Sequence, residues 1–433
     1  MNYFAVVDCD NCYVSCERVF RPDLKNTPVV VLSNNDGCVV ARSNEAKRMG
    51  IKAGTPYFQL AEQFPDQKIA VFSSNYELYG DLTGRVMAVL SQEAPEYFRY
   101  SIDEAFVILR GMEQVDLKEW GERLHRIIKQ RTGIPVSIGI APTKTLAKMA
   151  SHYAKHYAGY NHCCLIDDDE ERKKALKLYP IDDVWGIGRR YAARMDQMGI
   201  HTAYDFASKT PEWVTAAFRN IVVMRTWKEL NGIDCVPNDE PAKKKSICVS
   251  RSFPGMIGDL ELLKTYVANY AARCSEKLRK QHTLASVVGV FLSTNPFRQD
   301  LSQYSNFGEI TLLTPTSNSI DIVQKASECL TRLYRPGYQY KRAGVVVISM
   351  EGSGGIQTNF LDFDADRFQK LKSLDAVVDR INKLGGSETV IIGAQQFPGK
   401  DSKGKAQQFA DAIKHDYRSP NYTTRWSDII ELK

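Results

Sequence analysis

The sequence lacks any run of about 18 consecutive apolar residues, the length that a helix needs to cross a membrane. It also lacks, at its start, the basic stretch and apolar core of a secretion signal. We therefore expect no membrane association and a cytoplasmic location. A strong excess of one charge is missing as well, because 57 basic residues nearly balance 51 acidic ones and leave a net charge of +6. This balance permits binding to nucleic acid without demanding it.

The ten cysteines lack the spacing of a complete metal-binding motif. Cys9, Cys12 and Cys16 could belong to a zinc or iron–sulfur site, with a further ligand from residues 162–164. Half of a motif is weak evidence for such a site. Scattered cysteines are more typical of buried free thiols in a reducing compartment.

Two adjacent carboxylates, Asp103 and Glu104, lie between two apolar, strand-like stretches. Asp-Glu is a poor sequence for a two-residue hairpin turn, which favours Asn-Gly or Asp-Gly. Like charges side by side repel unless a cation lies between them, so the pair indicates a divalent metal site. An exposed acidic turn is the alternative interpretation.

A third carboxylate, Asp8, ends the apolar segment 2–7, which is typical of a buried strand. If this strand pairs with the strands around Asp103 and Glu104, the three carboxylates converge. Three carboxylates close together suit two Mg²⁺ ions, which bind oxygen ligands and can bind protein and substrate phosphate oxygens at the same time. Two such ions would stabilise the attacking and the leaving oxygen in phosphoryl or nucleotidyl transfer.

The order of elements predicts an α+β protein with several domains. Residues 1–167 read as β, an insertion, α, β, β, α, β, which indicates a ferredoxin-like domain. The insertion contains a strong hairpin signal at residues 34–37 and a helix that Ser43 can cap. After a polar linker at 237–245, residues 246–351 repeat the βαββαβ order and predict a second ferredoxin-like domain.

The predicted helix 143–158 carries Lys144, Lys148 and Lys155 on one face. Such a stripe is ordinarily a solvated face. Beside a metal site that handles phosphates, the same stripe can neutralise a triphosphate or a primer backbone.

The helical region 168–236 contains a glycine turn that resembles the turn of a helix-hairpin-helix motif. Gly186 and Gly188 would let backbone N–H groups approach a phosphate, and the start of the next helix favours an anion. Arg189 and Arg190 add positive charge there. Such hairpins bind the DNA backbone without reading its sequence. An ordinary turn between helices is the alternative.

Residues 8–13 and 101–106 together resemble the palm of a Y-family, lesion-bypassing DNA polymerase. Segments 29–39, 72–79 and 182–190 extend this resemblance, which covers essentially the whole chain. It implies error-prone, template-directed synthesis past damage with two Mg²⁺ ions, as part of a response to DNA damage. It also implies a palm (1–13 and 74–167), fingers (14–73), a helical thumb with the helix-hairpin-helix (168–236), a little finger (246–351) and a C-terminal extension (352–433).

The resemblance also implies roles for individual residues. Asp8, Asp103 and Glu104 would be the catalytic metal ligands, with the backbone carbonyl of Cys9 as a further ligand. The implied nucleotide contacts are Tyr13, as the gate that excludes a 2′-hydroxyl, with Asn44, Lys47 and Lys155. The implied DNA contacts are Gly186, Gly188, Arg189, Arg190 and Arg251.

The partners implied by the resemblance are primer-template DNA with a dNTP, a sliding clamp, a cleaved UmuD-like dimer and RecA. Gln357, Phe360 and Leu361 resemble the clamp-binding pentapeptide of bacterial polymerases. Packing of the two apolar residues against the little finger is the alternative. Near the end of the chain Asn421 stands where relatives often have Arg, which puts a contact there in doubt.

Two other functions use some of the same features. A nucleotide cyclase also carries carboxylates on a ferredoxin-like sheet, but it has no use for the glycine hairpin or for a second βαββαβ domain. A non-catalytic DNA-binding scaffold could keep the fold, but it would not need all three carboxylates.

Overall fold

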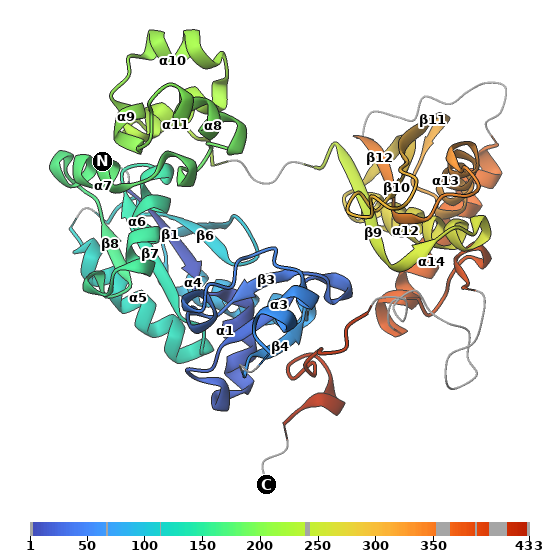
Figure 1. Ribbon diagram of the computed structural model, residues 1–433, viewed down its shortest axis with the longest axis horizontal. Helices are drawn as coiled ribbons and strands as arrows, with labels where there is room; N and C mark the ends of the chain where they lie inside the picture. The colour runs from blue at the N-terminus through green and yellow to red at the C-terminus, as the bar shows by residue number, and fades with distance from the viewer. Residues whose placement is uncertain are drawn as a thin grey trace. The chain divides into compact units, whose positions relative to one another are not determined.

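The structure is a computed structural model that describes residues 3–65, 68–112, 114–238, 243–351, 364–385, 388–397 and 414–430. The chain forms two compact units (Figure 1). The first unit combines Met1–Glu240 with Asp416–Lys433, and the second is Pro241–His415. Within the described ranges, no helix has both the length and the apolar character needed to span a bilayer.

A five-stranded sheet with the order β5-β6-β1-β7-β8 forms the centre of the first unit. Its first four strands in sequence confirm the predicted ferredoxin-like arrangement, in which the third strand lies between the first and the second. A short fifth strand, β8, adds to β7 in parallel and was not indicated by the sequence. The elements are β1 Phe4–Cys9, α4 Tyr76–Glu93, β5 Glu96–Arg99, β6 Glu104–Ile108, α5 Leu117–Thr132, β7 Val136–Ala141, α6 Lys144–His156 and β8 Cys163–Leu165.

The two faces of this sheet are covered by different helices because side chains alternate along each strand. Phe4 and Val6 of β1 pack in one core with α6, whereas Ala5 and Val7 pack in a second core with α4 and α5. Asp8 follows in the same alternation as Phe4 and Val6. Its carboxylate therefore lies on the face covered by α6.

The segment 12–73 is inserted after β1 and contains a three-stranded sheet with the order β3-β2-β4. The hairpin prediction is confirmed, because β2 and β3 pair antiparallel around a turn in which Asn35 and Asp36 have positive φ angles of 61° and 50°. Ser43 caps α2 as expected, accepting a hydrogen bond from the amide of Ala46 at 3.2 Å. The elements are α1 Cys12–Phe20, β2 Val29–Leu32, β3 Val39–Arg42, α2 Asn44–Arg48, α3 Tyr57–Gln63 and β4 Ala70–Ser73.

Five helices follow the sheet and share the core on the α6 side. The turn between the first two has Gly186 at a φ of +93°, in the left-handed region that favours glycine. The helices are α7 Asp169–Leu178, α8 Arg189–Gln197, α9 Ala203–Ala207, α10 Pro211–Phe218 and α11 Ile221–Leu230.

The second unit has the predicted βαββαβ order and an antiparallel sheet with the order β11-β10-β12-β9. Here the fourth strand lies between the first and the second, where the sheet of the first unit places its third strand. The order of elements along a chain does not decide which strand occupies this position. The elements are β9 Ser246–Ile257, α12 Leu260–Lys280, β10 Thr283–Thr294, β11 Ser305–Thr316, α13 Ser319–Leu333 and β12 Tyr340–Glu351.

The C-terminal extension is divided between the two units. Helix α14, Ala365–Gly385, packs on the second unit, where Arg279 of α12 forms ion pairs with Asp375 at 3.4 Å and Asp379 at 2.7 Å. Residues 416–430 belong to the first unit and contact α1, β4 and the start of α4.

Candidate active site

Asp8 and Glu104 are directly opposite each other on the paired strands β1 and β6. Side chains opposite each other on neighbouring strands share one face of the sheet, at about 5 Å between Cβ atoms. The predicted convergence of these two carboxylates is therefore confirmed. Both side chains retain about a fifth of their exposed surface, with 23% for Asp8 and 22% for Glu104.

Asp103 lies at the entrance to β6, where its backbone carbonyl accepts a hydrogen bond from the amide of Cys9 at 2.9 Å. The hydroxyl of Ser101 lies 2.6 Å from its carboxylate oxygen and accepts hydrogen bonds from the amides of Asp103 and Glu104. Residues 100–103 therefore form a compact, internally bonded turn. This turn fixes both acidic residues beside the end of β1.

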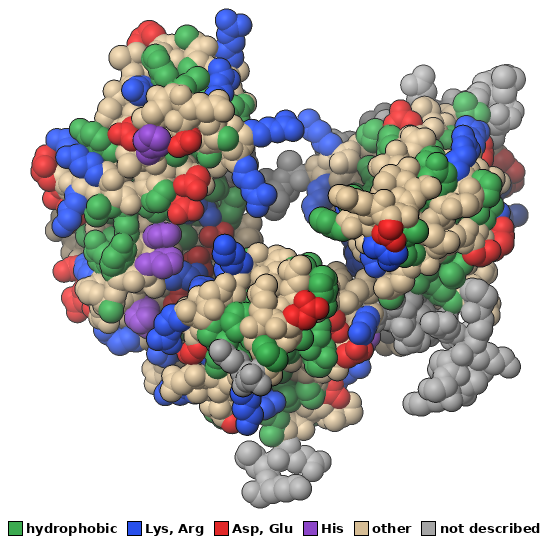
Figure 2. All heavy atoms as spheres, in the orientation of Figure 1, with side chains coloured by type: hydrophobic (Ala, Val, Ile, Leu, Met, Phe, Trp, Pro, Cys, Tyr) green, Lys and Arg blue, Asp and Glu red, His purple; other side chains and the backbone are tan. Residues whose placement is uncertain are grey.

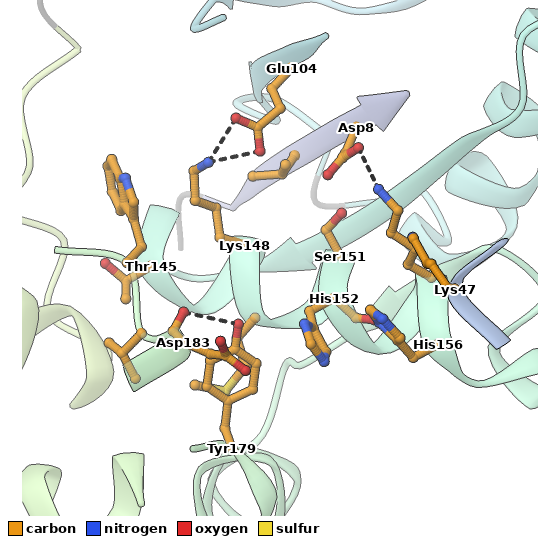
Figure 3. Close-up of a pocket in the computed structure, with 15 residues that line it drawn as sticks. Asp8, Lys47, Glu104, Thr145, Lys148, Ser151, His152, His156, Tyr179 and Asp183 are labelled. Atoms are coloured by element: carbon orange, nitrogen blue, oxygen red, sulfur yellow. Dashed lines mark hydrogen bonds and ion pairs between the residues drawn. The ribbon is translucent and has the colours of Figure 1, made fainter. Parts of the chain in front are cut away.

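Two lysines of α6 neutralise the carboxylates on this face. Lys148 contacts both oxygens of Glu104, at 2.9 and 3.0 Å, and Lys155 contacts Asp8 at 2.9 Å (Figure 3). Burial raises the pKa of the Asp8 carboxyl to about 6, although the ion pair with Lys155 acts in the opposite direction. Lys144 is buried instead, against Asp234 and the ring of Phe4, so only two of the three predicted lysines reach the site.

The predicted metal ligands are chemically suited to bind a divalent metal ion, but within the described part of the chain their carboxylates are not gathered at metal-ligand spacing. Asp8, Asp103 and Glu104 offer the carboxylate oxygens that Mg²⁺ prefers. The side chain of Cys9 is buried in the core, so its carbonyl is the group that could serve as a ligand. Each of Asp8 and Glu104 is paired with a lysine cation, which shows that this face favours positive charge.

A cavity of about 420 Å³ opens beside these groups (Figure 3). Lys47 of the inserted segment and Trp185, which precedes α8, both line it. The remaining lining residues come from β1, β6, α6 and the segment before α8: Val6, Asp8, Glu104, Thr145, Lys148, Met149, Ser151, His152, Lys155, His156, Tyr179, Asp183 and Val184.

Asn11 connects α2 of the inserted segment to the end of β1, and the sequence alone indicated no role for it. It adopts a left-handed conformation at the start of α1, with a φ of 46°. Its side chain donates to Asn44 at 3.1 Å and accepts from Lys47 at 2.7 Å. Both predicted nucleotide contacts on α2 are thus held close to the end of β1.

Asp10 is a fourth acidic residue that sequence reasoning missed. It accepts a hydrogen bond from Ser137 at 2.7 Å and lies 3.7 Å from the ammonium of Lys155. It follows Asp8 at a spacing of two, which is the signal that could have identified it.

Tyr13, the predicted gate, is half-buried between two other tyrosines. Its ring stacks on Tyr79 at 4.6 Å, with an angle of 14° between the planes, and contacts the edge of Tyr76 at 5.7 Å. These contacts hold the Tyr13 ring through its neighbours on α4.

Comparison with known proteins shows which family carries this arrangement. The model of the impB/mucB/samB family matches residues 7–152, and the model of that family's C-terminal domain matches residues 244–360. Protein UmuC of Salmonella typhimurium is 41% identical over 434 residues, which are 99% of this chain and 100% of that protein. The chain belongs to the impB/mucB/samB family.

Less similar proteins also match most of the chain. DNA polymerase IV of Dehalococcoides mccartyi is 28% identical over 89% of this chain and 96% of its own length. Among solved structures, a Y-family DNA polymerase chimera of Dbh and Dpo4 has a TM-score of 0.63 at 21% identity, covering 82% of this chain and all of the chimera. The fold is therefore that of Y-family polymerases. A further model, described only as a domain of unknown function, matches residues 372–432.

The predicted helix-hairpin-helix turn lies before α8, and its two glycines differ in their surroundings. A Cβ atom on Gly186 would overlap with the hydroxyl of Thr226, whereas Gly188 has open space at the start of α8. Arg189 and Arg190 begin α8 and are exposed to solvent. The predicted DNA contacts of the thumb thus lie together on an accessible turn.

The remaining predicted sites lie in the second unit. Arg251 is on β9 and donates to the backbone carbonyl of Ser250 at 2.9 Å. The predicted clamp-binding residues Gln357, Phe360 and Leu361 lie outside the residues that the structure describes.

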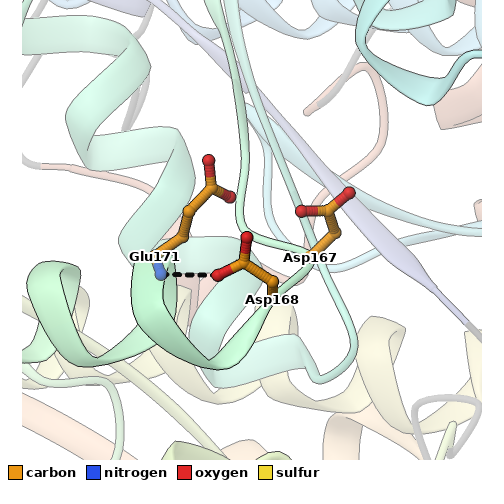
Figure 4. A group of neighbouring side chains, drawn as sticks. All are labelled: Asp167, Asp168 and Glu171. Atoms are coloured by element: carbon orange, nitrogen blue, oxygen red, sulfur yellow. Dashed lines mark hydrogen bonds between the residues drawn. The ribbon is translucent and has the colours of Figure 1, made fainter.

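Among the described residues, the one cluster with metal-ligand spacing does not include Asp8, Asp103 or Glu104. Asp167, Asp168 and Glu171 are exposed at the start of α7 (Figure 4). Asp168 accepts a hydrogen bond from the amide of Glu171 at 2.7 Å, which identifies it as the cap of that helix. Cys9, Cys12 and Cys16 pack in the hydrophobic core.

Proposed function

We infer that the chain is an error-prone, template-directed DNA polymerase that copies damaged DNA and adds a dNTP to a primer 3′-hydroxyl. The observation that carries this is the pairing of Asp8 with Glu104 on adjacent strands, next to Asp103, in a chain whose relative UmuC matches it over its whole length. A nucleotide cyclase would leave the thumb hairpin and the little finger without a role.

The chemistry belongs to two-metal nucleotidyl transfer. Mg²⁺, held by Asp8, Asp103, Glu104 and the Cys9 carbonyl, would supply a Lewis acid for the attacking hydroxyl and the leaving pyrophosphate. No side chain of the protein needs to act as nucleophile, so the contribution of the chain is positioning and charge stabilisation.

The lysines around the cavity bind the negative charge of the substrate. Lys155 lies beside Asp8, and a hydrogen bond to Asn11 holds Lys47 near the end of β1. Together they can neutralise a triphosphate. Lys47 offers a point charge rather than the two-pronged contact of an arginine, and weak nucleotide binding would follow.

DNA is bound by the thumb without regard to sequence. The exposed turn at Gly186 and Gly188 offers backbone N–H groups at the start of α8, and Arg189 and Arg190 add charge. Arg251 would contact DNA from the little finger. The further partners are a sliding clamp, bound through Gln357, Phe360 and Leu361, a cleaved UmuD-like dimer and RecA, in the cytoplasm.

The test is primer extension with Asp8→Ala and Asp103→Ala, each at saturating Mg²⁺. We expect nucleotide incorporation to fall by at least about 1,000-fold, since both carboxylates would hold ions that stabilise the transition state. Primer-template binding, measured by fluorescence anisotropy, should stay close to that of the unmodified protein.

Asp167→Ala is the matched control, because it removes an acidic side chain from the exposed cluster at α7. It should extend primers normally. Near-normal incorporation by Asp8→Ala or Asp103→Ala would contradict the assignment. Extension past an abasic site by the unmodified protein, with and without the named partners, then tests the translesion activity itself.

A further inference from the structure

Residues 416–421 return to the first unit and bind at the start of α4. Ser419 and Asn421 are 8% and 3% exposed, and they replace water around Asn75, which is completely buried. The amide of Asn75 donates to the backbone carbonyl of Ser419 at 3.0 Å and to its hydroxyl at 3.1 Å. Asn421 donates to Glu77 at 2.6 Å, so the position where relatives carry Arg still makes a polar contact with α4.

The hydroxyl of Ser419 also reaches a carboxylate inside the protein. Glu17 of α1 has no exposed surface, and its Oε1 atom accepts hydrogen bonds from Ser419 at 3.0 Å and from the hydroxyl of Tyr79 at 2.7 Å. Its Oε2 atom is buried and has no hydrogen-bond partner. Because a buried carboxylate is costly unless it is hydrogen-bonded, the position of Glu17 depends strongly on these two donors.

Tyr79 connects this buried carboxylate to the gate. It is itself completely buried, and its ring stacks on the ring of Tyr13 at 4.6 Å. Ser419, Glu17, Tyr79 and Tyr13 therefore form a continuous series of contacts. It leads from the C-terminal segment to the side chain that would lie under the sugar of the incoming nucleotide.

We propose that the C-terminal segment 416–421 is a positioning element for sugar selection, in which Ser419 fixes Glu17 and Tyr79 and thereby the ring of Tyr13. The inference rests on the proposed role of Tyr13 as the gate. It gives a function to part of the region that matches only a domain of unknown function.

The end of the chain also makes contacts that do not involve Glu17, among them two through tyrosine side chains. The hydroxyl of Tyr417 accepts a hydrogen bond from Tyr57 at 2.9 Å, and Tyr422 stacks on Phe20 at 4.5 Å. These contacts hold the segment on the fingers and on α1. They allow a hydroxyl to be removed from the segment without changing the environment of the buried carboxylate.

The experiment measures kcat/KM for a ribonucleotide and for the matching deoxyribonucleotide with the full chain, on an undamaged primer-template. In Ser419→Ala we expect ribonucleotide incorporation to rise by about fivefold relative to deoxyribonucleotide, which is the loss of about one hydrogen bond. The rise should lie in KM for the ribonucleotide, with deoxyribonucleotide kinetics nearly unchanged and a modest fall in the melting temperature from the lost buried hydrogen bonds. Tyr79→Phe, which removes the other donor to Glu17 and keeps the ring, should act in the same direction.

Tyr417→Phe is the matched control and should leave the ratio unchanged. Tyr13→Ala tests the gate itself, separately from the role of the C-terminal segment. If it raises the ratio while Ser419→Ala and Tyr79→Phe do not, the gate stands and the proposed role of the C-terminal segment is wrong. If Tyr13→Ala leaves the ratio unchanged, the gate itself fails and the inference fails with it. Equal losses for both sugars in Ser419→Ala would also overturn the inference, because they indicate a structural contact alone.

Discussion

Glu17 lies in the core between α1 and α4, and burial raises the pKa of its carboxyl to about 7. The hydrogen bonds from Tyr79 and Ser419 lower the pKa of Glu17, but by less than burial raises it. In an unfolded chain a glutamate titrates near about 4.3. Between these values the folded protein holds a proton that the unfolded chain has released, so stability falls as pH rises through this window and is constant above it.

Glu17→Gln should remove this part of the pH dependence, because an amide does not titrate. In the unmodified protein we expect the free energy of unfolding to decrease by an additional 2–3 kcal/mol, roughly, between about pH 5 and about pH 8. Urea unfolding of both proteins at each pH measures the difference. Asp8, whose pKa is also raised, contributes equally to both proteins and cancels.

The matched control for this comparison is Glu62→Gln, which changes an exposed glutamate of the fingers. It should keep the pH dependence of the unmodified protein. An identical pH dependence in Glu17→Gln would show that the buried carboxyl is not the group that titrates.

At the scale of single elements, the turn before α8 contains two glycines that differ in backbone conformation and in the space around them. Gly186 has a positive φ and no room for a Cβ atom, whereas Gly188 has a φ of −83° and open space around it. We expect Gly186→Ala to lower the free energy of unfolding by about 1–3 kcal/mol, through backbone strain and overlap with Thr226.

Gly188→Ala provides the control, and it should change stability by less than about 0.5 kcal/mol. Thermal or urea unfolding measures both variants. DNA affinity should fall in Gly186→Ala, because the N–H groups of the turn move away from their positions. Equal stability of the two variants would contradict the strain argument.

Elements with local signals were predicted well from the sequence. The hairpin at residues 34–37, the cap at Ser43 and the alternation around Asp8 depend on neighbours within a few positions. The convergence of Asp8 and Glu104 was also predictable, because antiparallel pairing brings a carboxylate near the end of one apolar strand next to a carboxylate at the start of the other. Helical spacing also predicted that Lys148 and Lys155 lie on one face of α6, where they pair with Glu104 and Asp8. Lys144, predicted on the same face, is buried instead.

Contacts between distant segments could not be predicted in this way. The bond between Ser419 and Glu17 joins residues 402 positions apart. No periodicity indicates which of the many serines fills a gap beside a buried glutamate. The strand order of the second sheet was equally open, because the βαββαβ order allows either the third or the fourth strand to lie between the first two.

At the scale of the whole molecule, the region with a domain of unknown function is not one compact domain. It matches residues 372–432, which begin within α14 on the second unit and end on the first. The little finger is therefore joined to the polymerase core at both of its ends.

A clamp would add a further tether. We expect Phe360→Ala combined with Leu361→Ala to weaken binding to the sliding clamp and clamp-stimulated synthesis, because two apolar anchors can dominate a small interface. Insertion without the clamp should be unchanged, since tethering raises local concentration without altering the active site. Calorimetry with the clamp and primer extension without it measure the two effects.

The control for the clamp experiment is Leu374→Ala, which removes an exposed apolar side chain from α14 outside the proposed motif. It should bind the clamp normally. Unchanged clamp affinity in the double variant, or an equal loss of clamp-free insertion, would favour packing of Phe360 and Leu361 against the little finger.

The path of the chain also sets the order in which the protein can be completed during synthesis. The ribosome releases the palm, fingers and thumb first and the whole second unit next, and only then residues 416–430. Until that moment Glu17 has Tyr79 as its donor but lacks Ser419, and the side chain of Asn75 lacks its acceptors on Ser419. A nascent or prematurely terminated chain thus carries the carboxylates of Asp8, Asp103 and Glu104 without the last support of the nucleotide site.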